Sequence, residues 1–207
     1  MRRRLASLAL VLTLLAPASA LAQDGPPKQG RRGTHFIGEI AAGSYVHGAG
    51  GFAWGGMLGF GGKPRGVPAR FYLVAGALRT GDATTRDTAG TRYVYDLQLT
   101  DVDFGLRVYF PIARGFRITT EALLGASLAD AELRDPSGYR THQNLSMPHL
   151  ALGLGPQLRL IHELSFGVMA RTMFVDTGNV RSTGPLSVWK EPLGRRTHVV
   201  GTMTFHW

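Results

Sequence analysis

The chain has 207 residues, of which 28 are glycine and none is cysteine, and its formal net charge is +9. The lack of cysteine excludes a disulfide framework and a thiolate metal site. The basic residues are scattered and nearly all arginine, without a long basic run or an aromatic-basic repeat, so we expect no nucleic-acid partner.

The first 22 residues have the pattern of an export signal. Three arginines, at positions 2–4, precede an apolar run over residues 5–15. Small residues follow, and both Ala18–Ala20 and Ala20–Ala22 fit a cleavage site. The apolar run is shorter than the roughly 18 residues of a spanning helix, so a signal peptide over residues 1–22 is favoured over an uncleaved anchor. We expect cleavage just before Gln23.

Residues 23–33 are rich in proline, glycine and charge, which predicts a flexible periplasmic lead-in. Without Arg2, Arg3 and Arg4 the formal charge falls from +9 to +6. The remaining chain, residues 34–207, has a length that suits one domain.

From residue 34 onward, bulky apolar residues alternate with small or polar ones, which is the period of a strand with two different faces. The stretch from Asp101 to Phe110 is an example: Val102, Phe104 and Leu106 alternate with aspartate, glycine and arginine. Eight such segments are predicted, within residues 36–43, 52–61, 70–80, 101–110, 116–126, 149–160, 164–174 and 198–207. Residues 121–133 could also form a helix.

The segments are joined by short connections at 63–68, 111–115 and 161–163, and by long polar ones at 81–92, 129–147 and 176–195. Only residues 47–51 form a short connection on the long side. Short turns at one end and long loops at the other are typical of outer-membrane barrels. Tyr93 to Leu99 have the opposite parity to the segment that follows, which indicates either a bulge near Thr100 or a loop hairpin.

The face opposite the bulky residues is glycine interrupted by single charged residues, which suits a narrow lumen better than the water-facing side of a soluble barrel. Aromatic residues near the segment ends fit the two girdles at membrane interfaces. The predicted fold is therefore an all-β, closed, antiparallel up-and-down transmembrane barrel. The residues predicted to form an ionic network in its lumen are Glu39, Arg70, Asp101, Asp103, Arg107, Arg117, Glu121, Arg159 and Arg171.

The C-terminus has alternating apolar positions at Val199, Met203 and Phe205 and ends in the aromatic Trp207. With the stretch DVDFGLRVYFPI over residues 101–112, it resembles the OmpA/OmpX-type small outer-membrane β-barrels of Gram-negative bacteria. The resemblance covers about residues 34–207, without a peptidoglycan-binding domain. It implies location in the outer membrane, contact with its lipid and lipopolysaccharide, and recognition of these four C-terminal residues by the barrel-assembly machinery. Phenylalanine is the more usual last residue.

Three functions are open at this stage. The preferred one is a structural or surface-interaction role for a barrel whose lumen is filled by ionic side chains. The alternative is a narrow pore or transporter for small solutes or apolar molecules. Third comes a lipid-modifying enzyme, which would depend on His149, His198 or Ser165. No nucleophile elbow or closely spaced ligand set is present, so we expect no catalytic site, no metal and no cofactor. The sequence does not identify a surface ligand.

Overall fold

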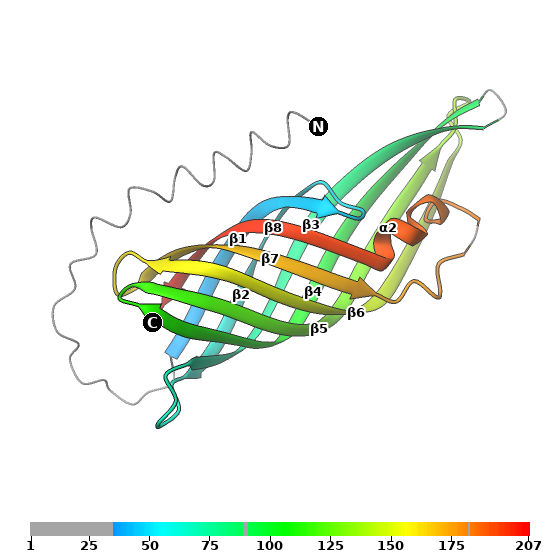
Figure 1. Ribbon diagram of the computed structural model, residues 1–207. Coiled ribbons are helices and arrows are strands. Elements are labelled where there is room, and N and C mark those ends of the chain that lie inside the picture. The colour runs from blue at the N-terminus through cyan, green and yellow to red at the C-terminus, as the bar shows by residue number, and fades with distance from the viewer. Residues whose placement is uncertain (1–34, 89–90, 182) are drawn as a thin grey trace.

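The computed structural model describes residues 35–88, 91–181 and 183–207, so the predicted signal peptide and lead-in lie outside the described residues. Eight antiparallel strands follow one another around a closed barrel, and the first also pairs with the last (Figure 1). The strands are β1 (His35–His47), β2 (Phe52–Gly62), β3 (Arg70–Thr88), β4 (Thr91–Ala113), β5 (Phe116–Arg134), β6 (Arg140–Arg159), β7 (Leu164–Val175) and β8 (Arg195–His206). The predicted fold is confirmed, and the helical alternative for residues 121–133 is wrong.

The two faces of each strand have the predicted orientation. In β1 the side chains of Ile37 and Glu39 are buried inside the barrel, whereas Phe36 and Ile40 are 57% and 56% exposed on its outer surface. Because successive side chains of a strand point to opposite faces, the sequence period alone determines this separation. We refer to the end with the turns after β2, β4 and β6 as the short-turn end and to the other as the hairpin end.

The main departure from expectation lies at the hairpin end. Residues 81–92 and 129–147 were expected to be loops, but they continue the strands as two long hairpins. The β3–β4 ladder runs from Arg70 opposite Tyr109 to Thr88 opposite Thr91. The β5–β6 ladder runs from Phe116 opposite Leu158 to Arg134 opposite Arg140. Figure 1 shows β3 to β6 extending beyond the rest of the barrel, away from the C-terminus.

The parity change before Thr100 has a simple origin. The register of β4 with both neighbours is continuous through this residue, so the bulge interpretation is wrong and the hairpin interpretation is right. Leu97, Leu99 and Asp101 all face inward and are buried. What changes is the chemistry of the two faces. In the protruding hairpin, which contains the part of β4 before Thr100, the inside is apolar and the outside is polar, as in a soluble barrel. Water therefore surrounds the hairpins, and an apolar medium surrounds the strands below them.

The connection from β7 to β8 folds over the hairpin end. It contains the short 3-10 helix η2 (Ser187–Trp189) and the helix α2 (Lys190–Gly194). Leu186, Trp189 and Leu193 are buried in one apolar cluster with Leu97 and Leu99 of β4. The connection was expected at 176–195 and is confirmed there, except that β8 already begins at Arg195. We call the described part of this segment, residues 176–181 and 183–194, the lid.

Of the residues that the structure describes, no helix has the length and hydropathy needed to span a membrane.

Close approach between strands depends on glycine at particular positions. A Cβ atom on Gly105 would collide with the backbone carbonyl oxygen of Ala122, whereas one on Gly201 would find its nearest neighbour 3.7 Å away. We therefore expect Gly105→Ala to destabilise the barrel by about 1–3 kcal/mol through overpacking, and Gly201→Ala to have little effect. Urea unfolding of both variants in detergent micelles measures the difference, and equal stabilities would contradict the explanation.

Candidate functional site

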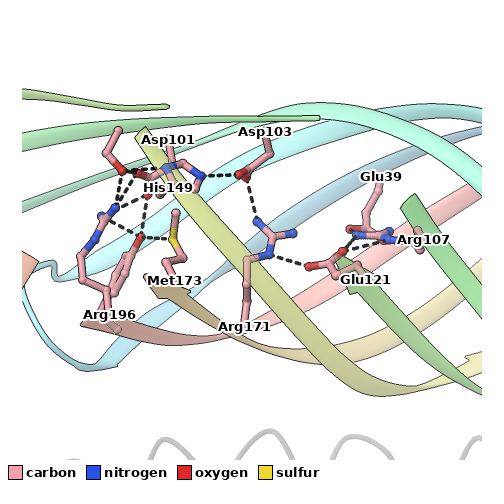
Figure 2. Close-up of polar contacts among 11 residues, drawn as sticks. Glu39, Asp101, Asp103, Arg107, Glu121, His149, Arg171, Met173 and Arg196 are labelled. Carbon is pink, nitrogen blue, oxygen red and sulfur yellow. Dashed lines mark hydrogen bonds and ion pairs between the residues drawn. The ribbon is translucent and has the colours of Figure 1, made fainter. Parts of the chain in front are cut away.

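The centre of the lumen is occupied by Arg107 of β4, which is fully buried. Its guanidinium donates two hydrogen bonds to Glu39 of β1, at 2.6 and 3.0 Å, and two to Oε2 of Glu121 of β5, at 3.1 and 2.7 Å. A charged group in such a space is tolerated when it is paired and fully hydrogen-bonded. One arginine thus bridges two carboxylates from two different strands (Figure 2).

A second arginine extends this cluster toward the hairpin end. Arg171 of β7 donates to Oε1 of Glu121 at 2.5 Å and to Oδ2 of Asp103 at 3.2 Å. The other oxygen of Asp103 lies 2.7 Å from Nε2 of His149. His149 is in turn 3.0 Å from the hydroxyl of Ser127 through its Nδ1 atom.

The last carboxylate of the row is Asp101, which is completely buried. Arg196 of β8 binds it with both terminal nitrogens, at 3.1 and 2.7 Å. The hydroxyls of Ser127 and Tyr45 donate to the same carboxylate at 2.6 and 2.9 Å. Bidentate pairing of this kind is strong and directional. The Tyr45 hydroxyl also contacts the sulfur atom of Met173, which belongs to the apolar cluster (Figure 2).

The network also continues toward the short-turn end. Thr204 donates to Glu39 at 2.8 Å and accepts from Gln157 at 2.6 Å. Gln157 accepts from Nε of Arg117 at 2.7 Å. Arg117 further contacts Ser165, at 2.9 Å. An unbroken series of side-chain hydrogen bonds therefore runs through the lumen from Arg196 to Arg117.

The outer surface of the barrel below the hairpins is apolar. Large side chains that are at least half exposed there include Phe36, Ile40, Trp54, Leu58, Phe60, Phe104, Leu124 and Leu154. A contiguous apolar surface of this extent is not left to water in a soluble protein, and it fits the lipid-facing band of a membrane barrel.

The comparisons agree with this geometry. A major outer membrane protein of Thermus thermophilus superposes with a TM-score of 0.51 at 13% identity, covering 85% of this chain and 100% of that chain. The chain has the fold of an outer-membrane β-barrel. The attachment invasion locus protein Ail of Yersinia pestis matches at a TM-score of 0.49 and 14% identity, covering 86% of this chain and 100% of that chain. The N-terminal barrel domain of Pseudomonas aeruginosa OprF matches at a TM-score of 0.49 and 12% identity, covering 84% of this chain and 97% of that chain. No family model and no curated protein matches the chain.

Within the barrel, the predicted ionic residues divide into two groups. The structure joins Glu39, Asp101, Asp103, Arg107, Glu121, Arg171 and, through Gln157 and Thr204, Arg117. Arg70 and Arg159 instead lie at the short-turn end. Arg159 donates to the backbone carbonyls of Ile161 and His162.

Sequence reasoning missed Arg196 and Ser127. Arg196 follows directly after the predicted loop, so its inward position at the start of β8 was not recognised. Ser127 stands at the outer end of a segment whose secondary structure was ambiguous. The signal that could have found both is the inward parity of each strand, which continues beyond the predicted segment ends.

The four C-terminal residues that were predicted to be recognised during assembly lie at the outer surface of β8 and at the end of the chain that follows it. Trp207 pairs with Phe36 of β1 through two backbone hydrogen bonds, and its side chain is 67% exposed. The side chains of Val199, Met203 and Phe205 are half-buried on the outward face of β8. Their recognition by the barrel-assembly machinery stays a prediction.

Ser127, His149 and Asp103 have the mutual contacts of a catalytic triad, with the hydroxyl 3.0 Å from one ring nitrogen and the carboxylate 2.7 Å from the other. The hydroxyl is nevertheless completely buried and is held between Asp101 and Arg196. A nucleophile needs room for a substrate beside it, so this arrangement is suited to structure rather than to hydrolysis. Within residues 35–88, 91–181 and 183–207 no group of acidic and histidine side chains could hold a metal.

The protruding part of β3 forms an unpaired sheet edge. β2 pairs with β3 only as far as Thr80, and within the described part of the chain residues 82–88 pair with β4 alone. The Gly81 carbonyl accepts from Gly51 on the β2 side, at 2.9 Å. Because the backbone groups of alternate residues point to the same side, the amides of Ala83, Thr85 and Asp87 face the open edge. We call residues 82–88 the β3 edge.

The other hairpin is held in shape by local polar contacts. Nε of Arg134 donates to Glu132 at 2.7 Å, and this hydrogen bond lowers the pKa of Glu132. At the tip, Ser137 donates to Asp135 at 2.7 Å and lowers the pKa of its carboxyl. The turn presents Tyr139, whose side chain is 69% exposed. The hairpin tip thus has a defined shape.

Proposed function

We propose that the protein is a closed outer-membrane barrel that does not conduct solutes and that presents its protruding hairpins to an extracellular partner. The first half of this proposal is supported by the lumen. Eight buried charged residues of the described part of the chain lie across it, namely Glu39, Asp101, Asp103, Arg107, Arg117, Glu121, Arg171 and Arg196. At the hairpin end, the lid covers this row of charges with apolar side chains. A conducting pore needs a continuous water-filled path, and side chains packed across the lumen oppose one.

The second half rests on one observation, the β3 edge. A strand with one unpaired side can accept an extended segment of another protein, since the backbone hydrogen bonds supply affinity. Asp82 hydrogen-bonds the amide of Ala83 at 2.9 Å, and such charged residues limit uncontrolled pairing of edges. The amides of Thr85 and Asp87 remain available for a partner strand.

Conductance tests the closed lumen. Purified barrel reconstituted in planar lipid bilayers is expected to give no single-channel steps. A positive control porin in the same bilayers shows that steps would be seen. Regular steps of a single size would support the alternative of a narrow pore and overturn the proposal of a closed barrel.

A proline substitution tests the β3 edge. Thr85→Pro removes an amide donor on the open side without breaking the β3–β4 ladder, because proline is compatible with edge strands. Its control, Thr85→Val, keeps the donor. The probe is a soluble peptide of alternating threonine and valine with a lysine at each end, applied to cells that display the protein. We expect binding to the original chain and to Thr85→Val and about tenfold weaker binding to Thr85→Pro, the loss of one to two hydrogen bonds. Equal binding by both variants would contradict strand addition.

A further inference from the structure

The arginine at the short-turn end of the lumen differs from the others in its partners. Arg107, Arg171 and Arg196 each contact at least one carboxylate. Arg117 is only 8% exposed, yet its hydrogen-bond partners in the described part of the chain are all neutral. They are Oε1 of Gln157 at 2.7 Å, the hydroxyl of Ser165 at 2.9 Å and Nε2 of His206 at 2.7 Å. The ring of Tyr109 lies 4.2 Å from its guanidinium carbon.

More positive charge surrounds this group. Arg70, on β3, and Arg159, on β6, are close enough for their charges to act on both Arg117 and His206. The strand register explains both positions. Arg159 follows Gln157, the partner of Arg117, by one inward position on β6. Arg70 lies opposite Tyr109, the residue whose ring packs against Arg117. The carboxylate in the turn from β6 to β7, Glu163, is well exposed and lies 3.6 Å from His162.

A mostly buried cation without a carboxylate partner is unfavourable unless an anion reaches it. The hydrogen bonds of Arg117 within the described residues use Nε and Nη2 and leave Nη1 available. Arginine guanidinium groups bind the oxygens of a phosphate in pairs, and Ser165 offers a further hydroxyl beside them. We infer that Arg70, Arg117 and Arg159 form a binding site for a phosphate group at the short-turn mouth of the lumen.

The phosphate could come from the headgroup of an inner-leaflet phospholipid or from a free phosphate in the periplasm. Only this choice rests on the proposed function, since it requires the short-turn end to face the periplasm. Binding of inorganic phosphate to the barrel in a zwitterionic detergent does not depend on the orientation in a membrane, nor on a closed lumen or on the β3 edge. The two proposals can therefore fail separately.

The test is a titration with inorganic phosphate followed by the amide resonances of the folded barrel. We expect saturable chemical-shift changes at the amides of Ser165 and His206. The same changes are expected in the control variant Arg79→Gln, which alters an exposed arginine of β3. Both Arg117→Gln and Arg70→Gln should weaken binding by about tenfold or more, because each removes a charge-assisted hydrogen bond. Arg70 is half-buried at the strand end, so its substitution tests the site even where Arg117→Gln fails to fold.

Nanodiscs distinguish the sources. The same amides are compared in discs of phosphatidylcholine alone and in discs that also contain phosphatidylglycerol. Shifts that appear only with phosphatidylglycerol, and are reduced in Arg70→Gln, would assign the site to a lipid headgroup. Shifts that need free phosphate would assign it to a soluble ligand. No saturable shift at the mouth in either arm, or shifts unchanged in both arginine variants, would overturn the proposal.

Discussion

Replacing Arg107 with methionine is expected to lower the free energy of unfolding by about 3–5 kcal/mol, the cost of leaving buried carboxylates without their partner. The variant keeps much of the side-chain volume but removes all four hydrogen bonds to Glu39 and Glu121. Arg171 still binds Glu121, so the main loss falls on Glu39, which among the described residues keeps the hydrogen bond from Thr204 alone. Urea unfolding in phosphocholine micelles, followed by tryptophan fluorescence, measures the change.

A second substitution shows whether charge is the cause. Adding Glu39→Gln to Arg107→Met removes the uncompensated carboxylate and should restore part of the lost stability. Arg79→Met is the matched control, since Arg79 is exposed and its side chain donates to Gln98 rather than to a carboxylate; there we expect a change within about 0.5 kcal/mol. If Arg107→Met were as stable as this control, the network would have no role in holding the barrel together.

An arginine placed on the lipid-facing surface should have a comparable effect. Leu154 of β6 is 58% exposed near the middle of the apolar band. In a bilayer, Leu154→Arg is expected to cost about 2–4 kcal/mol, because the charge must be moved into hydrocarbon. The measurement is the folded fraction in lipid vesicles as a function of urea, read from the faster gel migration of the unboiled barrel.

Asn144→Arg is the control, ten residues away on the outward face of the same strand but on the protruding hairpin. Its side chain is exposed to water on our assignment, so the expected change is within about 0.5 kcal/mol. The pair locates the membrane boundary on β6. Equal small costs at both positions would place the apolar band outside a bilayer and would contradict the outer-membrane assignment.

Much of the fold could be predicted because strand period and membrane thickness both act along the sequence. Alternation around Val102 and Phe104 indicated which face meets lipid, and that orientation is confirmed. The two protruding hairpins could not be predicted from the same rule. There the medium outside the barrel changes from lipid to water, so the apolar residues Leu97 and Leu99 face inward while Asp96 and Gln98 face out. The strand is continuous through this change, but its alternation of apolar and polar residues is inverted, which in the sequence looks like the end of a strand.

The residues that face the lumen could be predicted, but not the pairs that they form there. Parity alone placed Asp101, Arg107 and Glu121 inside. Which arginine meets which carboxylate depends on how far each strand is shifted along its neighbour around the ring, and this stagger leaves no local trace in the sequence. Arg196 is the clearest case, because it contacts Asp101 across the barrel although 95 residues separate them in the chain.

The contacts in the lumen have a mechanical consequence. Backbone hydrogen bonds join each strand only to its two neighbours, and a ring linked in this way can still flatten into an ellipse. Three ion pairs instead cross the lumen and connect strands that are not adjacent. They join Arg107 to Glu39, Arg171 to Glu121 and Arg196 to Asp101. The barrel should therefore keep a nearly circular cross-section when lateral pressure in the surrounding bilayer changes, and the hairpins above it should keep their spacing.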